Sequence, residues 1–270
     1  MHFNCPKCQG KLNIYDSKCS CDAGHSFDKS RGGYYNLLLG NAGGVHGDNK
    51  EMVLSRRAFL GAGFYEPLVK RLSALVTDYT PCGAALLDAG AGEGYYTDYI
   101  ERALMLKYGK SDVSAFDISK DAVRELCKKN PRISAVVAGS YHMPVPDGEF
   151  DTVVNTFSPL ALSETARVLK QNGIFIMAIP GENHLFDLKQ VIYDTPYKNT
   201  VADTAIDGFE LVVDENLTYS IYLGNAEAVK NLFMMTPYAY RTSAEGRARV
   251  EALDSLKCTA DFRIFVYRRT

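Results

Sequence analysis

Hydrophobic and polar positions follow three different patterns along the chain. Residues 1–38 contain only short strand-like pieces separated by turn residues. From 84 to 179, short apolar runs alternate with segments whose apolar residues recur at helical spacing. The remainder is less regular and predicts a helix over 225–235 and a final strand over 262–267.

The alternating region indicates an α/β fold. Its predicted strands are 85–87, 113–116, 133–138, 152–155 and 174–179, and its predicted helices are 95–106, 120–129 and 163–169. Strands that are apolar throughout, and that alternate with helices, are typical of a parallel sheet covered on both faces. We therefore expect a Rossmann-like domain.

Between the first region and this domain lies a connecting segment. The glycine-rich stretch 40–44 reads as a flexible linker. Asp48 followed by Glu51 fits a helix start of the capping-box kind, with the helix ending near Gly61, and a second helix is expected over 65–76. The predicted organisation is a zinc-binding, RNA-recognition module at 1–38, linker and helices packing on the cofactor site at 39–80, and a catalytic domain at 81–270.

Composition places the chain among ordinary soluble proteins. Hydrophobic residues make up 46% and charged residues 23%, and the formal net charge is −2. Neither a membrane-spanning run nor a secretion signal is recognisable, so we expect a cytoplasmic protein without membrane association. Any nucleic-acid contact must come from local basic patches, because the chain is not basic overall.

A glycine-rich loop at 88–94, reading DAGAGEG, follows the first predicted strand of the sheet. Gly90, Gly92 and Gly94 let the backbone approach a ligand closely, and ligands of open α/β sheets bind at the carboxyl ends of strands. The spacing differs from the dinucleotide fingerprint, because the third glycine comes one residue early. Glu93 would repel a pyrophosphate but suits a ligand with a sulfonium and an ammonium group, which favours S-adenosyl-L-methionine.

Two aspartates near this loop are further candidates for cofactor binding. Asp117 ends the second predicted strand, where a carboxylate can accept both ribose hydroxyls of an adenosine. The alternative for Asp117 is that it only caps the following helix. Asp88 either contacts the cofactor indirectly or only braces the loop.

A cluster of metal-ligand residue types lies near the amino end, at Cys5, Cys8, Cys19, Cys21 and His25. Two ligand pairs separated by a short hairpin, with strands near 12–15 and 18–20, can surround one tetrahedral ion. Two thiols as near in sequence as Cys19 and Cys21 would both have to turn inward from one short strand. We therefore favour a structural Zn²⁺ site formed by Cys5, Cys8, Cys21 and His25.

The chain resembles the bacterial 23S ribosomal RNA guanine-N1 methyltransferases known as RlmA and TlrB along essentially its whole length. The motifs that carry the resemblance are CPKC at 5–8, CDAGHSFD at 21–28, GYYNLL at 33–38, RRAFL at 56–60, GEGYYT at 92–97, PGENHL at 180–185 and MTPY at 235–238. The segment NTFSP at 155–159 departs from the family's usual sequence before its proline.

The resemblance implies a class I methyltransferase fold with a zinc-ribbon-like module. It also implies transfer of a methyl group from S-adenosyl-L-methionine to N1 of a guanine in a 23S ribosomal RNA hairpin, zinc at the four ligands above, and a possible homodimer. Cofactor contacts are implied for Tyr65, Gly92, Glu93 and His184.

Chemistry at guanine N1 requires removal of a proton, and no residue identifies itself as the base. Asn155 and its segment, and His184, are weak candidates, and we favour cofactor contact for His184. For RNA, the candidates are basic residues that give the first region a local excess of positive charge: Lys7, Lys11, Lys18, Lys29 and Arg31. Tyr34 and Tyr35 either stack on bases or pack in the core.

Three functions compete on the sequence. A ribosomal RNA methyltransferase is favoured. A small-molecule methyltransferase of the same class would leave the zinc module unexplained. An RNA-binding protein without catalysis is disfavoured, because the cofactor loop is intact.

Overall fold

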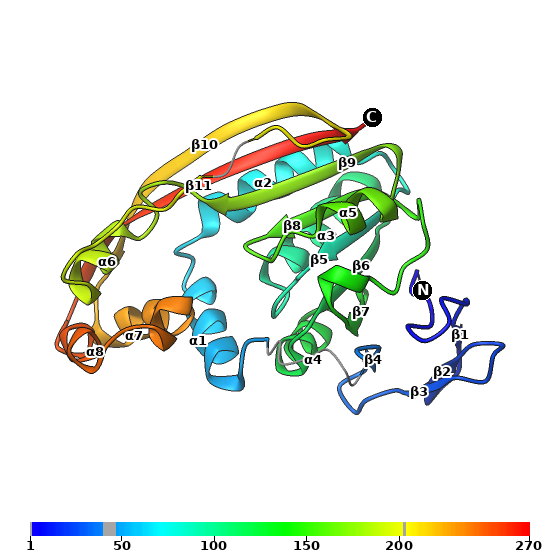
Figure 1. Ribbon diagram of the computed structural model, residues 1–270, viewed down its shortest axis with the longest axis horizontal. Helices are drawn as coiled ribbons and strands as arrows, with labels where there is room; N and C mark the ends of the chain where they lie inside the picture. The colour runs from blue at the N-terminus through cyan, green and yellow to red at the C-terminus, as the bar shows by residue number, and fades with distance from the viewer. Residues whose placement is uncertain (1, 40–46, 202–203) are drawn as a thin grey trace.

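An eight-stranded sheet organises the protein, in a computed structural model that describes residues 2–39, 47–201 and 204–270. The strand order is β10-β11-β9-β8-β5-β6-β7-β4 (Figure 1). The strands are β4 (Tyr35–Asn36), β5 (Ala85–Ala89), β6 (Asp112–Asp117), β7 (Ser134–Val137), β8 (Phe150–Thr156), β9 (Leu169–Pro180), β10 (Phe209–Leu223) and β11 (Leu256–Arg269).

The predicted parallel sheet is confirmed for β5 to β9, which pair in parallel. The two long strands β10 and β11 run antiparallel, β11 beside β9 and β10 at the edge. Of these, only part of β11 was predicted from the sequence. The two strands extend from the sheet to a group of helices at the left of Figure 1.

Helices cover both faces of the sheet. Their bounds are α1 (Lys50–Gly61), α2 (Glu66–Tyr79), α3 (Tyr95–Tyr108), α4 (Lys120–Lys129), α5 (Leu162–Val168), α6 (Phe186–Ile192), α7 (Ala226–Met234) and α8 (Ala244–Glu251). Neighbouring residues of a strand point to opposite faces. Leu86 accordingly joins the core formed with α2, α3 and α4, whereas Leu87 joins the core on the α5 side.

The start of α1 differs from the prediction. Its N-cap is Asn49, whose side chain accepts a hydrogen bond from the backbone N–H of Met52 at 3.0 Å. Asp48 instead forms an ion pair with Arg56, nearly two turns into the helix. The capping box at Asp48 and Glu51 was therefore wrong by one residue, because the asparagine side chain competes equally well for the cap.

The amino-terminal region forms a three-stranded sheet of β1 (Asn13–Ile14), β2 (Lys18–Ser20) and β3 (Ser26–Asp28), which confirms the predicted hairpin. Phe3, Leu12 and Leu37 of this region are buried in the core on the α5 face of the main sheet. The strand β4 then pairs in parallel with β7. The region is thus joined to the α/β domain both by side-chain packing and by backbone pairing.

The predicted linker at 40–44 lies outside the described residues. Within the described residues, no helix has both the length and the apolar character needed to cross a membrane.

Candidate active site and metal centre

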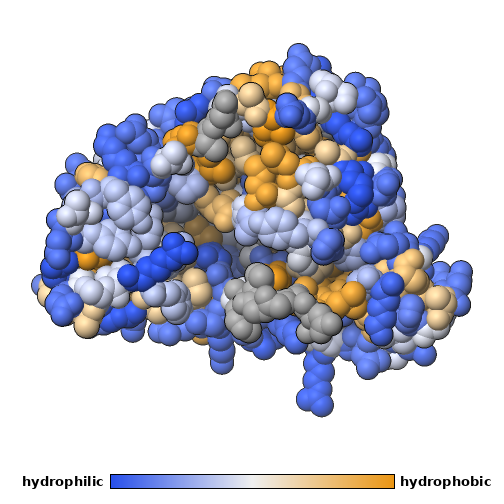
Figure 2. All heavy atoms as spheres, viewed as in Figure 1, coloured by the Kyte–Doolittle hydropathy of each residue, from blue (hydrophilic) through white to orange (hydrophobic). Residues whose placement is uncertain are grey.

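A cavity of about 1080 Å³ opens at the carboxyl ends of β5, β6 and β8. Figure 2 shows a hollow on this face of the molecule, with apolar side chains around it. Its lining comes from the cofactor loop, from the helix α1, and from Pro6 and Gln9 of the amino-terminal region. The amino-terminal region, the segment with α1 and the α/β domain therefore all contribute to this site.

The glycine loop has the backbone geometry that its sequence requires. The φ angles of Gly90, Gly92 and Gly94 are +94°, +56° and +80°, a region that other L-residues rarely adopt. A Cβ on Gly90 would lie 1.9 Å from Oγ of Ser158, so the loop packs against the segment after β8. A Cβ on Gly94 would lie 2.7 Å from Leu126 of α4. Gly90 and Gly92 line the cavity, whereas Gly94 does not.

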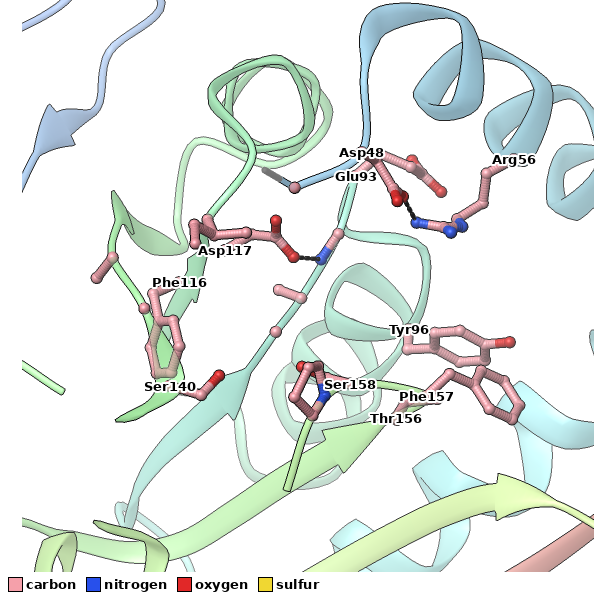
Figure 3. Close-up of a pocket in the computed structure, with 18 of the residues that line it drawn as sticks. Asp48, Arg56, Glu93, Tyr96, Phe116, Asp117, Ser140, Thr156, Phe157 and Ser158 are labelled. Atoms are coloured by element: carbon pink, nitrogen blue, oxygen red, sulfur yellow. Dashed lines mark hydrogen bonds and ion pairs between the residues drawn. The ribbon is translucent and has the colours of Figure 1, made fainter. Parts of the chain in front are cut away.

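Asp117 lies at the end of β6 and lines the same cavity. One of its carboxylate oxygens accepts a hydrogen bond from the backbone N–H of Gly92 at 2.9 Å (Figure 3). The other oxygen accepts one from the backbone N–H of Ser119 at 2.8 Å. Burial raises the pKa of Asp117, while these backbone donors oppose the rise. The helix α4 is capped by the side chain of Ser119, so Asp117 is not the cap.

Glu93 is almost completely buried, with 2% of its surface exposed. Its Oε2 accepts a hydrogen bond from Lys129 at 2.5 Å. Its Oε1 has no hydrogen-bond partner among the described residues, and neither do the buried hydroxyls of Tyr95, Tyr96 and Thr156, which also line the cavity. Buried polar atoms are nearly always paired, so these four unpaired atoms, which lie just behind the cavity surface, make this wall unusually polar. A carboxylate among them fits a ligand that carries ammonium and sulfonium charge.

Asp88 lies beneath the loop and does not line the cavity. It is 1% exposed and accepts a hydrogen bond from the hydroxyl of Thr97 at 2.6 Å. Burial raises its pKa to about 7, and the Thr97 bond only partly offsets the rise. Of the two roles that the sequence left open for Asp88, the geometry favours bracing the loop against α3.

His184 and Tyr65 meet on the opposite side of the cavity. The Tyr65 hydroxyl lies 3.2 Å from His184 Nε2, and His184 Nδ1 accepts a hydrogen bond from the backbone N–H of Asp261 at 3.3 Å. Burial lowers the pKa of His184 to about 4. The ring is therefore neutral, with its only lone pair already used, and is a poor general base.

Asn155 is not part of the cavity wall. Its side-chain amide donates to the carbonyl oxygens of Ala89 at 3.2 Å and Pro159 at 3.4 Å. An amide has no basic atom at neutral pH, and this one is buried between two loops. Asn155 thus fixes the segment after β8 to the end of β5.

Several cavity residues were missed from the sequence. Arg56, which the sequence singled out only as part of the RRAFL motif, forms the ion pair with Asp48 and donates to the carbonyl of Met235 at 3.1 Å. Phe157 lines the cavity with a left-handed backbone, φ +56°. Neither feature has a sequence signal, because one depends on a contact across the fold and the other on a backbone angle.

The four predicted zinc ligands come together in the amino-terminal region. The ligand atoms of Cys5, Cys8, Cys21 and His25 all lie within 4.8 Å of one another. The Cys8–Cys21 sulfur distance and both contacts of His25 Nδ1 to sulfur are 3.5 Å. The edges of a tetrahedron around Zn²⁺ with thiolate bonds are about 3.8 Å, so the set fits zinc.

Cys19 is fully buried but lies outside this set. Burial raises its pKa to about 11, so it stays a neutral thiol. The cluster offers four protein ligands and no position for substrate, which is the arrangement of a structural site.

The basic side chains of the amino-terminal region are exposed, as RNA contact requires. They are Lys7, Lys11, Lys18, Lys29 and Arg31. Tyr35, considered for base stacking, is 5% exposed and packs in the core as part of β4, so that alternative was wrong.

Two family models match the chain. Residues 3–40 match the model described as "RlmA, N-terminal", a zinc ribbon, and residues 87–177 match the model of a methyltransferase domain. The first match spans the metal cluster and β4, and the second spans the glycine loop and β5 to most of β9.

Curated relatives match over nearly the full length. A putative 23S rRNA (guanine-N(1)-)-methyltransferase of Micromonospora griseorubida is 32% identical over 99% of this chain and 97% of the relative. A 23S rRNA (guanine(748)-N(1))-methyltransferase of Streptomyces fradiae is 29% identical over 92% of this chain and 89% of the relative. A putative 23S rRNA (guanine-N(1)-)-methyltransferase of Bacillus subtilis, YxjB, is 28% identical over 98% of this chain and 96% of the relative.

Proposed function

The chain belongs to the family of 23S rRNA (guanine-N1)-methyltransferases, and from this membership we propose that it transfers a methyl group from S-adenosyl-L-methionine to N1 of a guanine in a 23S ribosomal RNA hairpin. The observation that carries the proposal is the shared cavity. One wall is the glycine loop with the unpartnered Oε1 of Glu93, and another is the zinc-ribbon segment with Pro6 and Gln9.

Residues on three sides of the cavity would hold the methyl donor. Asp117 would accept the ribose hydroxyls, while Gly90 and Gly92 allow the backbone to approach. Glu93 would pair with positive charge. Tyr65 and His184, linked by their hydrogen bond, would close the far side next to the donor's amino-acid portion. Asp88 and Gly94 shape the loop from beneath without contact.

When bound, S-adenosyl-L-methionine supplies a methyl group on a sulfonium, which is a good leaving group. The task of the chain is therefore to align the acceptor nitrogen with that methyl group and to exclude competing water. The N1 proton of guanine must also leave. Asn155 has no basic atom, and the lone pair of His184 is already used, so we propose that solvent at the cavity mouth takes the proton.

The zinc ribbon is proposed to bring the RNA to the cavity. Its exposed lysines can contact phosphates, which fix the position of an RNA without reading its sequence. Zinc at Cys5, Cys8, Cys21 and His25 holds the short loop that includes Pro6 and Gln9. The metal thus supports the cavity wall and takes no part in the transfer.

The alternative is a small-molecule methyltransferase on the same core. Primer extension on 23S rRNA from a strain that lacks the gene separates the two functions. A methyl group on N1 blocks Watson–Crick pairing and stops reverse transcription. We expect a stop at a guanine in the parent strain, none in the deletion strain, and its return on complementation; identical stops in all strains would contradict the proposal.

We propose that the protein acts in the cytoplasm, because bacterial ribosomal RNA is made and assembled there. The homodimer implied by the family resemblance stays a prediction, which light scattering on the zinc-loaded protein would test.

A further inference from the structure

Phe157 combines two features that are rare in one residue. Its φ angle of +56° is in the left-handed region, where a bulky aromatic side chain is an outlier. Its side chain is also 39% exposed, although it lines a largely apolar cavity. Residues held in such conformations persist only when surrounding structure fixes them, and they cluster at functional sites.

The surroundings of Phe157 supply this constraint. Its backbone N–H donates to the carbonyl of Ala178 on β9 at 3.1 Å, and the next residue, Ser158, packs against Gly90. The preceding hydroxyl, on Thr156, is buried at the cavity with no partner among the described residues. The segment is therefore fixed on both sides and presents the aromatic ring of Phe157 to the cavity.

Other aromatic rings surround the Phe157 ring. The centroid of its ring lies 5.6 Å from that of Phe262, 6.1 Å from that of Tyr96 and 6.3 Å from that of His184. The planes of the Phe157 and His184 rings are inclined to each other by 21°. Figure 3 shows Phe157 beside Tyr96 at one end of the cavity, away from Asp117. The three neighbouring side chains are buried, so Phe157 is the member of this group that offers a free surface.

The strand order of the sheet indicates which reactant lies against the exposed ring of Phe157. Asp117 is the last residue of β6 and Phe157 directly follows β8, and these two strands lie on opposite sides of β5. A donor with its ribose at Asp117 extends across the loop toward β8. The acceptor base then lies beyond the methyl group, on the side of β8.

We propose that Phe157 is the platform on which the extruded target guanine stacks, so that N1 faces the methyl group. This inference rests on the proposed function and adds a substrate-positioning residue to it. Enzymes that modify a base take it out of its stack and hold it between aromatic or apolar side chains. The strained backbone of Phe157 places its ring before the base arrives, which lowers the ordering cost of binding.

The test uses the full-length, zinc-loaded protein and a synthetic hairpin carrying the guanine at which the wild type produces a reverse-transcription stop. A second hairpin has an abasic site in place of that guanine. Binding of both RNAs, of S-adenosylmethionine and of S-adenosylhomocysteine is measured for the wild type, Phe157→Leu and Phe157→Tyr. Tyr222→Leu, an aromatic side chain exposed on β10 outside the cavity, is the matched control.

We expect Phe157→Leu to weaken binding of the intact hairpin by about 5- to 150-fold, the range of one base–aromatic stack. Binding of the abasic hairpin and of both cofactor forms should change less than about twofold, which also shows that the variant is folded. Phe157→Tyr and Tyr222→Leu should behave as the wild type. If Phe157→Leu does not bind S-adenosylhomocysteine, Phe157→Met replaces it, because methionine fills the space without an aromatic face.

If Phe157→Leu loses affinity equally for the intact and the abasic hairpin, the stacking role of Phe157 is contradicted. A loss of affinity for S-adenosylmethionine but not for S-adenosylhomocysteine would also overturn it, because the ring would then face the sulfonium. If the wild type itself methylates no guanine, the proposed function fails before the platform is tested. If the wild type methylates the guanine and Phe157→Leu binds the intact hairpin as tightly as the wild type, only the stacking role of Phe157 is contradicted.

Discussion

The carboxylate of Asp117 accepts a hydrogen bond from the backbone N–H of Gly92 at 2.9 Å, which ties the end of β6 to the glycine loop after β5. The two residues are 25 positions apart, and each lines the cavity. This bond fixes the loop in its left-handed conformation while leaving carboxylate lone pairs for a ligand. This side of the cavity is thus fixed by the fold itself.

Asp117→Asn should weaken S-adenosylhomocysteine binding by about 10-fold or more, because hydrogen bonds to a charged acceptor are worth roughly 1.5–3 kcal/mol. Calorimetry measures the affinity. Asp121→Asn is the matched control, since Asp121 lies on α4 and pairs only with Arg124 among the ion pairs described. Unchanged affinity in Asp117→Asn would show that this carboxylate does not contact the donor.

Gly90→Ala should abolish the close packing of the loop on the segment after β8. The new Cβ would lie 1.9 Å from Oγ of Ser158, and overpacking of this kind costs roughly 1–3 kcal/mol. Donor affinity should fall, and Ser158→Gly in the same chain should restore part of it. Gly109→Ala has a similar backbone angle, φ +70°, but open space around the Cβ, so it should leave donor affinity unchanged. Failure of the double variant to recover any affinity would argue against this contact.

Cys8→Ser should remove the zinc and with it the support for the loop at Pro6 and Gln9. Structural zinc contributes folding free energy directly, so the module should lose its fold. Methylation of RNA should then be lost, while donor binding falls less, because the glycine loop is intact. Zinc content by atomic emission and donor affinity by calorimetry check this. Cys82→Ser, also exposed but outside the cluster, should keep its zinc; zinc loss there would contradict the assigned ligand set.

Two buried groups should give opposite contributions to stability as the pH falls. The pKa of His184 is lowered by burial from 6.5 to about 4, so its stabilising contribution is complete above about pH 6.5 and is lost progressively toward pH 4. The pKa of Asp88 is raised by burial from 3.8 to about 7, so its ionised form destabilises the fold above pH 7 and that cost disappears toward pH 4. In the wild type the two trends largely offset each other.

Single variants should separate these trends. Relative to the wild type, His184→Gln should gain free energy of unfolding as the pH falls from about 6.5 to 4, by on the order of 3 kcal/mol. Asp88→Asn should show the opposite, with its advantage over the wild type shrinking between about pH 7 and 4. Urea unfolding across this range provides the measurement. Parallel pH profiles for both variants and the wild type would contradict the assigned pKa directions.

Much of the fold could be predicted because burial leaves a pattern in the sequence. The strands β5 to β9 are apolar runs, and α4 was predicted over the residues it occupies, although its cap is Ser119 and not Asp117, the alternative considered from the sequence. The strand β10 was missed because it is an edge strand with charged and polar residues at Glu210 and over 214–216. The short helices α6 and α8 span less than three turns, too little for a periodic signal.

The candidate site was predictable where residue type decides the chemistry. The four zinc ligands, the glycines of the loop and Asp117 all follow from spacing, and the structure brings each group together. The pairing of Tyr65 with His184 spans 119 positions and depends on the fold. The strained backbone of Phe157 and the inward position of Arg56 likewise have no local signature.

The most direct measurement is transfer from a methyl-deuterated S-adenosylmethionine to unmodified 23S rRNA by the zinc-loaded protein. The digested nucleosides are then analysed by mass spectrometry. We expect the deuterated methyl group in 1-methylguanosine and in no other nucleoside, with a weaker signal in Asp117→Asn at a donor concentration below saturation. Label in a different nucleoside, or none in RNA while the protein binds the donor, would contradict guanine-N1 methylation as the activity of this chain.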